Sequence, residues 1–337
     1  YKKLKFSPYP NYIGRIKRFF YNKLLSKVFI DICSFLEFFY VLITIGIKNY
    51  DLIIAVDREG IIESRYWNIF FQTPVIFISY EILFEDETSR EFKLIEKKSS
   101  KFISKWIVQD KQRSFLLSKE NNLSEKNRFI LPISSSNKII KAKYRLRDKL
   151  KIQKNKKVAI LMGSLSEWSM AEDVIKSVNY WPSDWCLIIH ERYGKTHDFL
   201  KKIPNENLPK IGEKLFISNQ PEKFVDSLDS ILSGVSMGFA FYNPNFKSIY
   251  TGKNLACIGM ASGKISTFLR GGIPVIMNEI GEISNQAKLN GFGHVVNHPK
   301  EISNLLVSAD CEKMSLMAKK YYEKNISFDL YKDSLKK

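Results

Sequence analysis

Two series of short apolar runs, each run followed by a stretch with helical spacing, constrain the fold of this 337-residue chain more than any other feature. The first series starts at "YDLIIAVD", residues 50–57, whose uninterrupted apolar character predicts a parallel strand buried on both faces. The second starts at "VAILMGS", residues 158–164, which predicts a strand that runs into a Gly-Ser turn. Alternating strands and helices of this kind predict doubly wound parallel sheets, so we expect two Rossmann-like α/β domains.

Ligands bind such sheets at the carboxyl ends of the strands, so the predicted strand ends locate candidate sites. The expected strands are residues 50–57, 73–81, 107–110 and 128–134 in the first series, and 158–164, 185–191, 214–220, 237–242, 274–278 and 293–297 in the second. A basic, polar stretch separates the two series. The predicted organisation is an N-terminal domain over 1–140, a connection over 141–157, a C-terminal domain over 158–325 and a tail over 326–337.

The net charge of +18 is concentrated at the start of the chain. Between Tyr1 and Ile30 there are eight Lys or Arg residues, several aromatic residues and no acid. Such a segment fits an anionic membrane surface better than nucleic acid, because the chain has no nucleic-acid-binding motif. No signal peptide is visible and the chain begins without methionine, so we expect the natural N-terminus to be missing. The four cysteines are scattered without metal-ligand spacing, which is typical of reduced thiols in the cytoplasm.

The most apolar stretch of the chain is "FIDICSFLEFFYVLITIGI", residues 29–47. Asp31 and Glu37 interrupt it, and it is barely long enough to span a bilayer. We therefore expect a buried helix ahead of a strand, with a helix lying in the plane of a membrane as the alternative.

Two turns of the second series combine glycine and hydroxyl residues in a way that suits phosphate. In "ASGKISTFLRGG", residues 261–272, a serine, a bare backbone and a lysine open a short helix, whose N-terminus carries free N–H groups and partial positive charge. The turn "GSLSEWS", residues 163–169, follows the first strand of the same domain. Either turn alone is explained by ordinary helix capping, but the two together favour a diphosphate site.

Other common sites are not indicated by the sequence. There is no GxxxxGK[ST] loop, no GxGxxG after the first strand, no GxSxG elbow and no HExxH, so neither a P-loop nor a metal site is predicted. Of the four histidines, only His190, at the end of a predicted strand, is expected near the ligand site, and a lone histidine is more often structural.

Several stretches, in order, resemble GT-B-fold glycosyltransferases, in particular the large retaining family 4 group that includes capsule and lipopolysaccharide enzymes. "KISTFLRGGIPVI" is similar to the segment of that family that lines the sugar-nucleotide site, and "YDLIIAVDREG" and "TPVIFISYEI" resemble its acceptor domain. The resemblance implies two Rossmann-like domains that face a cleft, a UDP- or GDP-sugar donor, and a surface-glycan acceptor such as a lipid-linked oligosaccharide.

The resemblance also implies roles for individual residues of the second domain. Thr267 stands where the family has the second glutamate of its E-x7-E pair, and the first glutamate is absent too, so the usual ribose contact is in doubt. The residues that would contact the nucleotide sugar are Gly163, Ser164, Leu165, Ile217, Ser218, Ser262, Gly263, Lys264, Ile265, Ser266 and Thr267. His190 and Arg192 are secondary candidates.

Transfer from a nucleotide sugar needs stabilised negative charge on the leaving diphosphate, which helix N-termini and cations supply without a metal cofactor. Lys264 is the first candidate cation. Asp57, Glu59 and Glu81 are the acids of the first domain expected to orient the acceptor hydroxyl or take its proton. Two alternatives stay open at this point: a GT-B-fold sugar-nucleotide epimerase, which has no acceptor, and a non-catalytic partner subunit that kept the fold and lost the acids.

Overall fold

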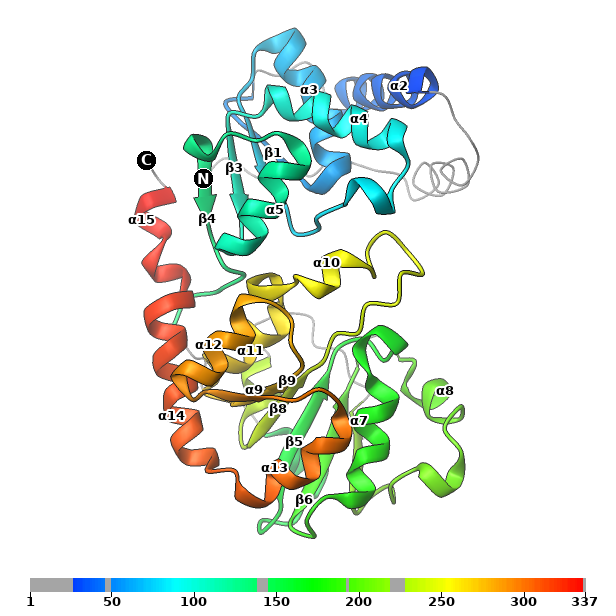
Figure 1. Cartoon of the computed structure of the whole chain (residues 1–337), viewed down its shortest axis with the longest axis vertical. Helices are drawn as coiled ribbons and strands as arrows, with labels where there is room; N and C mark the ends of the chain where they lie inside the picture. The colour runs from blue at the N-terminus through cyan, green and yellow to red at the C-terminus, as the bar shows by residue number, and fades with distance from the viewer. Residues whose placement is uncertain (1–26, 46–49, 138–144, 192–193, 219–227, 336–337) are drawn as a thin grey trace. The chain divides into compact units, whose positions relative to one another are not determined.

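The computed structural model describes all residues except 1–26, 46–49, 138–144, 192–193, 219–227 and 336–337 (Figure 1). It divides into two units, Tyr1–Ile130 and Leu131–Lys337, and each unit contains its own parallel sheet. The first sheet has four strands and the second has six, with helices between successive strands. The prediction of two Rossmann-like α/β units is therefore confirmed.

The strands of the N-terminal unit lie in chain order, and every neighbouring pair is parallel. Because parallel crossovers are right-handed, strands added in one direction place all their connecting helices on the same face of the sheet. The strands are β1 (Ile53–Val56), β2 (Val75–Ile78), β3 (Lys105–Val108) and β4 (Arg128–Ile130), and the connecting helices are α3 (Asp57–Phe71), α4 (Arg90–Ser99) and α5 (Lys111–Asn121).

The expectation that residues 50–57 form a strand buried on both faces is wrong. Ala55 is buried, but Ile54 and Val56 are 53% and 45% exposed. The cause is the topology: β1 pairs only with β2 among the described strands, and the helices cover the face to which Ala55 belongs. Ile54 and Val56 lie opposite Ile76 and Ile78 of β2, so the other face of the sheet is apolar and open at this edge.

The apolar stretch before β1 forms helix α2 (Lys27–Ile45), as expected. It packs on α3 mainly through Phe38, whose ring lies 5.4 Å from that of Trp67 in an edge-to-face arrangement. Among the described helices, none is long and apolar enough to cross a membrane.

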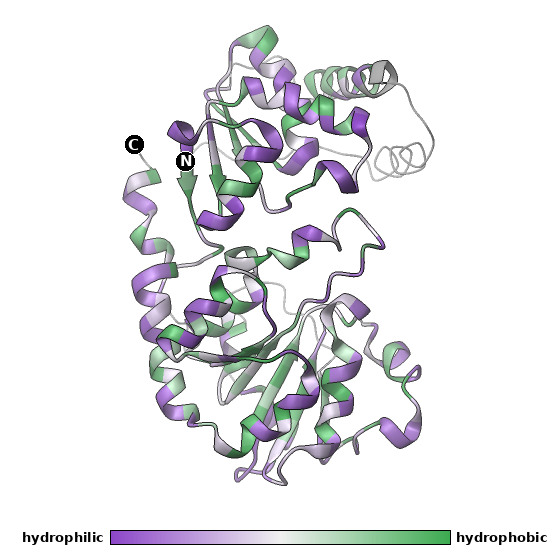
Figure 2. Cartoon of the chain, viewed as in Figure 1, coloured by the Kyte–Doolittle hydropathy of each residue, from purple (hydrophilic) through white to green (hydrophobic). Residues whose placement is uncertain are grey.

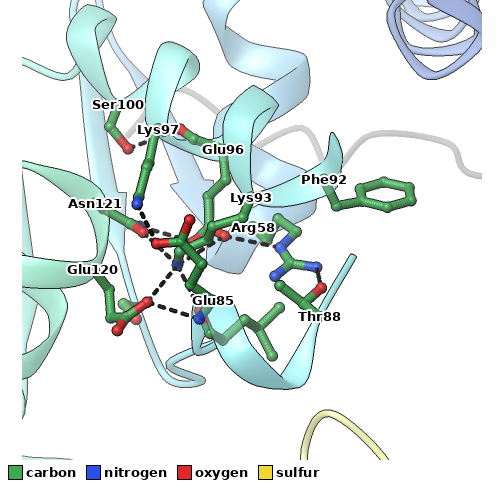
Figure 3. A network of polar contacts seen from close by, with 12 residues as sticks. Arg58, Glu85, Thr88, Phe92, Lys93, Glu96, Lys97, Ser100, Glu120 and Asn121 are labelled. Carbon is green, nitrogen blue, oxygen red and sulfur yellow. Dashed lines mark hydrogen bonds and ion pairs between the residues drawn. The ribbon is translucent and has the colours of Figure 1, made fainter. Parts of the chain in front are cut away.

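A buried polar network ties α3, α4 and α5 together (Figure 3). Lys93 Nζ lies 2.8 Å from Asn121 Oδ1 and 3.3 Å from Glu96 Oε2, and it donates to the Leu83 carbonyl at 2.5 Å. Arg58 Nε donates to the same Glu96 oxygen at 3.0 Å. Glu96 thus neutralises two buried cations that come from different helices, and this fixes the helical layer against the sheet.

The C-terminal unit contains a doubly wound sheet of strand order β10-β9-β8-β5-β6-β7. The order runs outward from β5 in one direction and from β8 in the other, so the connections change faces between β5 and β8. The strands are β5 (Lys157–Met162), β6 (Trp185–His190), β7 (Leu215–Ser218), β8 (Met237–Ala240), β9 (Val275–Met277) and β10 (Gly293–Val295). The helices are α6 (Leu146–Lys149), α7 (Ala171–Ser177), α8 (Thr196–Leu200), α9 (Leu228–Leu232), α10 (Lys253–Ala256), α11 (Gly263–Arg270), α12 (Glu282–Asn290), α13 (Ile302–Ser308), α14 (Cys311–Tyr321) and α15 (Lys332–Leu335).

Helix α11 is seated on this sheet by a glycine. A β-carbon on Gly238 of β8 would lie 2.6 Å from the ring of Phe268, which is fully buried on α11. Only glycine therefore allows α11 to come this close to β8. At its other end α11 stops at Arg270, and Gly272 adopts the left-handed conformation (φ 67°) that glycine favours after a helix.

Candidate functional site

The ends of β5 and β8 define the point where the strand order of the C-terminal sheet reverses, which is where open α/β sheets bind ligands. Gly163 follows β5 with φ of 103°, a conformation that side-chain-bearing residues rarely adopt. Phe241 and Tyr242 follow β8, and both are buried. The two strand ends are adjacent because β5 and β8 are paired.

The N-terminus of α11 lies at the same reversal point. Ser262 caps the helix, since its Oγ accepts a hydrogen bond from the backbone N–H of Ile265 at 3.3 Å. The next two backbone N–H groups, of Gly263 and Lys264, have no acceptor among the residues that the structure describes. They are the free donors that a helix N-terminus offers to an anion.

The side chain of Lys264 bridges the two strand ends. Its Nζ lies 5.2 Å from the ring centroid of Tyr242, a cation–π contact, and a β-carbon on Gly163 would be only 3.6 Å from its Cε. In the described part of the chain no carboxylate pairs with this ammonium. The residue keeps partial exposure, yet burial around its ammonium lowers the pKa of Lys264 to about 8. A desolvated cation without a counter-ion is suited to an anionic ligand.

Tyr242 is a site residue that the sequence reasoning missed. Its hydroxyl lies 2.7 Å from Ser262 Oγ, and burial raises the pKa of Tyr242 to about 12, so the phenol stays neutral. Asn278, after β9, fixes its backbone by accepting from the Tyr242 N–H and donating to its carbonyl. Trp168 stacks on its other side. The available signal was the aromatic residue that ends the predicted strand 237–242; its relevance depends on strand order, which the sequence does not reveal.

The remaining predicted residues of α11 are buried or hydrogen-bonded within the helix. Ile265 and Ser266 are buried, and the Thr267 hydroxyl donates to the carbonyl of Gly263 at 2.7 Å. In this conformation the Thr267 hydroxyl is therefore engaged in a hydrogen bond within α11.

The predicted residues at the ends of β6 and β7 come together as a second polar pair. His190 Nδ1 lies 3.0 Å from Ser218 Oγ, and both residues are buried. Ile217 and, after β5, Leu165 are partly buried against the hydrophobic core. Ser164 is partly exposed and its carbonyl accepts from Ser169. The secondary candidate Arg192 lies outside the described residues.

In the N-terminal unit Asp57 is strained and partly buried. It is the first residue of α3, not the end of the strand, and its φ is 53°. Its Oδ1 accepts from the backbone N–H groups of Tyr80 at 2.7 Å and Glu81 at 2.9 Å. Burial nevertheless raises the pKa of Asp57, with a further contribution from the nearby Glu59 carboxylate.

The other two predicted acids, Glu59 and Glu81, are partly exposed. Both lie near Asp57. Glu59 is in the first turn of α3, and Glu81 follows β2 and donates its backbone N–H to Asp57 Oδ1. Arg113 stabilises the same edge of the sheet, since it donates to the Tyr80 carbonyl at 2.6 Å and to Gln109 at 3.0 Å. The structure thus places the three acids at the carboxyl ends of β1 and β2.

No group of His, Cys, Asp and Glu residues in the described part of the chain could hold a metal ion. The ammonium of Lys264 beside Gly163 would also repel one.

The fold is shared with known proteins of distant sequence. The sequence matches no protein-family model and no curated protein. Among solved structures, HepE of Anabaena in complex with UDP matches with a TM-score of 0.64 and 14% identity over 89% of this chain and 80% of that one. Sucrose-phosphate synthase from Thermosynechococcus elongatus matches with a TM-score of 0.64 and 10% identity over 91% and 77% of the two chains. WaaG, a glycosyltransferase involved in lipopolysaccharide biosynthesis, matches with a TM-score of 0.53 and 11% identity over 82% of each.

These matches define the class of fold. The chain has two parallel α/β sheets and the GT-B fold of glycosyltransferases, as its sequence resemblance implied.

Proposed function

We propose that this protein is a glycosyltransferase that moves a sugar from a UDP- or GDP-sugar to a surface glycan, such as a lipid-linked capsule or lipopolysaccharide oligosaccharide. The C-terminal unit binds the donor at the reversal point between β5 and β8. The N-terminal unit supplies Asp57, Glu59 and Glu81 toward the acceptor. The protein works in the cytoplasm, on the inner face of the membrane, without a metal cofactor and without nucleic acid.

The observation that carries this proposal is the ammonium of Lys264, which has no carboxylate partner among the residues that the structure describes. It lies against Gly163 and Tyr242, beside two free N–H groups at the start of α11. A diphosphate placed there would receive hydrogen bonds from Gly263 and Lys264 and would neutralise a cation that is costly to keep charged. The same donors would stabilise the charge that develops on the diphosphate as it leaves the sugar.

The strained Asp57 supports the acceptor side of the proposal. A partly buried carboxylate with a raised pKa, on a residue held in a left-handed backbone conformation, is typical of functional positions. A raised pKa brings the carboxyl closer to the range in which it can take a proton from a sugar hydroxyl at neutral pH. Glu59 and Glu81 are alternatives for the same role.

The similar structures support the nature of the donor. HepE of Anabaena was solved with UDP and with UDP-glucose, and WaaG is itself a glycosyltransferase of lipopolysaccharide biosynthesis. Because Thr267 lacks the carboxylate expected for a ribose contact, we infer that the diphosphate provides most of the binding in this chain.

The test is a thermal-shift and calorimetric screen of UDP, GDP and their sugars on the wild type, Lys264→Ala and Lys300→Ala. A ligand that binds only the folded state raises the melting temperature by mass action. We expect one nucleotide to stabilise the wild type and the Lys300→Ala control, and Lys264→Ala to reduce its affinity at least tenfold. If Lys264→Ala bound the nucleotide as tightly as the wild type, the proposed location of the donor site would be wrong.

Product analysis then separates the alternatives. Transfer requires an added acceptor, so conversion of the sugar nucleotide in the absence of any acceptor would indicate an epimerase. Absence of binding by every nucleotide sugar at millimolar concentration would indicate a non-catalytic partner subunit.

A further inference from the structure

Helix α2 exposes an apolar face to solvent along its length. Its exposed large side chains are Ile32, Phe35, Leu36, Phe39, Tyr40 and Ile43, here called the outer face of α2. Ile43 is 71% exposed and Leu36 is 60% exposed. Figure 2 shows hydrophobic residues along this helix. The opposite side of α2 packs on α3 through Phe38 and Val41, so the helix is apolar on both sides.

The two acids of this stretch do not lie on the outer face. Asp31 turns to α3, where its Oδ1 accepts from Arg65 Nη2 at 2.8 Å, and Glu37 is 6% exposed. They are the only charged residues between 31 and 44, so the outer face carries no charge. The sequence alone suggested that these acids interrupt the apolar surface, but the fold turns them away from it.

Helix α3 extends the same surface. Ile69 and Phe70 are about half exposed, and the ring of Phe70 lies 6.3 Å from Phe35 and 5.6 Å from Phe38. A contiguous exposed patch of this kind on a folded protein usually marks an interaction site.

The charge of the neighbouring chain indicates the partner. The residues that lead into α2, from Tyr1 to Ile30, include eight Lys or Arg residues and no acid. An uncharged apolar helix face that directly follows a basic segment is typical of helices that lie in the interface of anionic bilayers. A second copy of this chain would be repelled, because the chain itself carries a net charge of +18.

We propose that the outer face of α2 docks in the headgroup region of an anionic lipid bilayer, with the helix parallel to the membrane plane. This inference deepens the proposed function, since the enzyme and a lipid-linked acceptor would then lie on the same membrane surface. It does not depend on donor binding, and it is tested separately from it.

The test is flotation of the full chain with vesicles of pure phosphatidylcholine or of phosphatidylcholine with 30% phosphatidylglycerol, at low and high salt. The variant Leu36→Glu/Phe39→Glu places two charges on the outer face, where both side chains are exposed and the fold should tolerate them. The matched control is Leu289→Glu/Val307→Glu, which changes two highly exposed apolar residues of the C-terminal unit.

We expect the wild type and the control to float with the anionic vesicles at low salt, and the α2 variant to bind at least tenfold more weakly. UDP binding should be equal in all three proteins, so a failure of docking is distinguishable from a failure of the donor site. Equal flotation of the α2 variant would overturn the inference, because the basic segment alone would then explain binding. No flotation of the wild type would also overturn it, as would self-association without lipid that the α2 variant abolishes.

Discussion

At the scale of single residues, Lys264 is kept in a state that disfavours folding. Burial desolvates its ammonium, which is the reason its pKa falls, and no carboxylate of the described residues pairs with it. Ligand sites often lower the stability of the folded protein, because their groups are arranged to bind a ligand and have no equivalent partner when the ligand is absent. Removing the charge of Lys264 should therefore stabilise the folded protein in the absence of ligand.

Replacing Lys264 by methionine tests this cost. Met keeps most of the apolar stem against the Tyr242 ring and removes the buried charge. We expect Lys264→Met to raise the free energy of unfolding at pH 7 by about 1–3 kcal/mol and to abolish nucleotide binding. Urea unfolding and calorimetry check the two effects. A variant that is both less stable and unable to bind would show that Lys264 is a structural residue.

The same lysine predicts how the system responds to pH. Between pH 8 and the unfolded-state pKa near 10.5, the unfolded chain binds more protons at this residue than the folded one, so the Lys264 contribution to stability rises with pH. Ligand binding has the opposite dependence, since a diphosphate favours the protonated ammonium. We expect affinity for UDP to fall above pH 8, by up to about tenfold per pH unit. Calorimetry in buffers of different ionisation enthalpy should detect proton uptake at pH 8.5, and Lys264→Met should show none.

Asp57 allows a replacement that separates chemistry from structure. An asparagine Oδ1 can still accept the two N–H bonds from Tyr80 and Glu81, while the carboxylate is lost. We expect Asp57→Asn to fold with unchanged or higher stability, to bind donor normally and to lower the transfer rate at least 100-fold. Single-turnover assays check the rate. If Glu59→Gln or Glu81→Gln is the damaging change instead, the proton acceptor is that residue.

At the scale of elements, the buried network around Glu96 holds the helical layer of the N-terminal unit together. Glu96 faces Arg58 of α3 and Lys93 of its own helix, while the ion pair between Glu85 and Lys97 lies nearby at the surface (Figure 3). The two glutamates are close in space and differ mainly in exposure. They are therefore a matched pair for measuring what burial does to an ion pair.

Removing the buried acid should cost far more than removing the surface one. Glu96→Gln removes the carboxylate that Arg58 and Lys93 share and leaves Lys93 only Glu120, at 3.5 Å, so we expect a loss of about 3–5 kcal/mol. For Glu85→Gln we expect no resolvable loss, because its ion pair with Lys97 is exposed to water and screened. Urea denaturation monitored by circular dichroism gives both values. Similar losses for the two variants would mean that Glu96 is not the neutralising group of the network.

The sequence predicted the positions of the strands better than it predicted the burial and the neighbours of their residues. Every predicted strand from residue 50 onward overlaps an observed one, because continuous apolar runs between turn residues are a local signal. The exposure of Ile54 and Val56 could not be predicted, since it depends on strand order. The same applies to Tyr242, whose place beside Lys264 follows from the pairing of β5 with β8. The Gly163 and Lys264 turns were predictable because their chemistry is local.

At the scale of the whole molecule, the site that the geometry supports best lies within one of the two units. Gly163, Tyr242 and Lys264 all belong to Leu131–Lys337. Donor binding can therefore stabilise this unit without stabilising the other.

Hydrogen exchange should make this division visible. We expect saturating UDP to slow amide exchange in the turn after β5 and at the start of α11, and to leave α3, α4 and α5 unchanged. Mass spectrometry of peptides from both units measures the effect. Protection spread equally over both units would contradict a site confined to the C-terminal one.

The one-sided winding of the N-terminal sheet also affects how the protein behaves when concentrated. Strand β1 has an edge that no described strand covers, and Ile54 and Val56 leave its face apolar. A free strand edge with aliphatic side chains is a template on which other chains can add as strands, and natural sheets often protect such edges with lysine or proline. The described part of β1 has neither. Aggregation through this edge should therefore compete with folding at high concentration, and Ile54→Lys is the substitution that would suppress it while leaving the nucleotide site untouched.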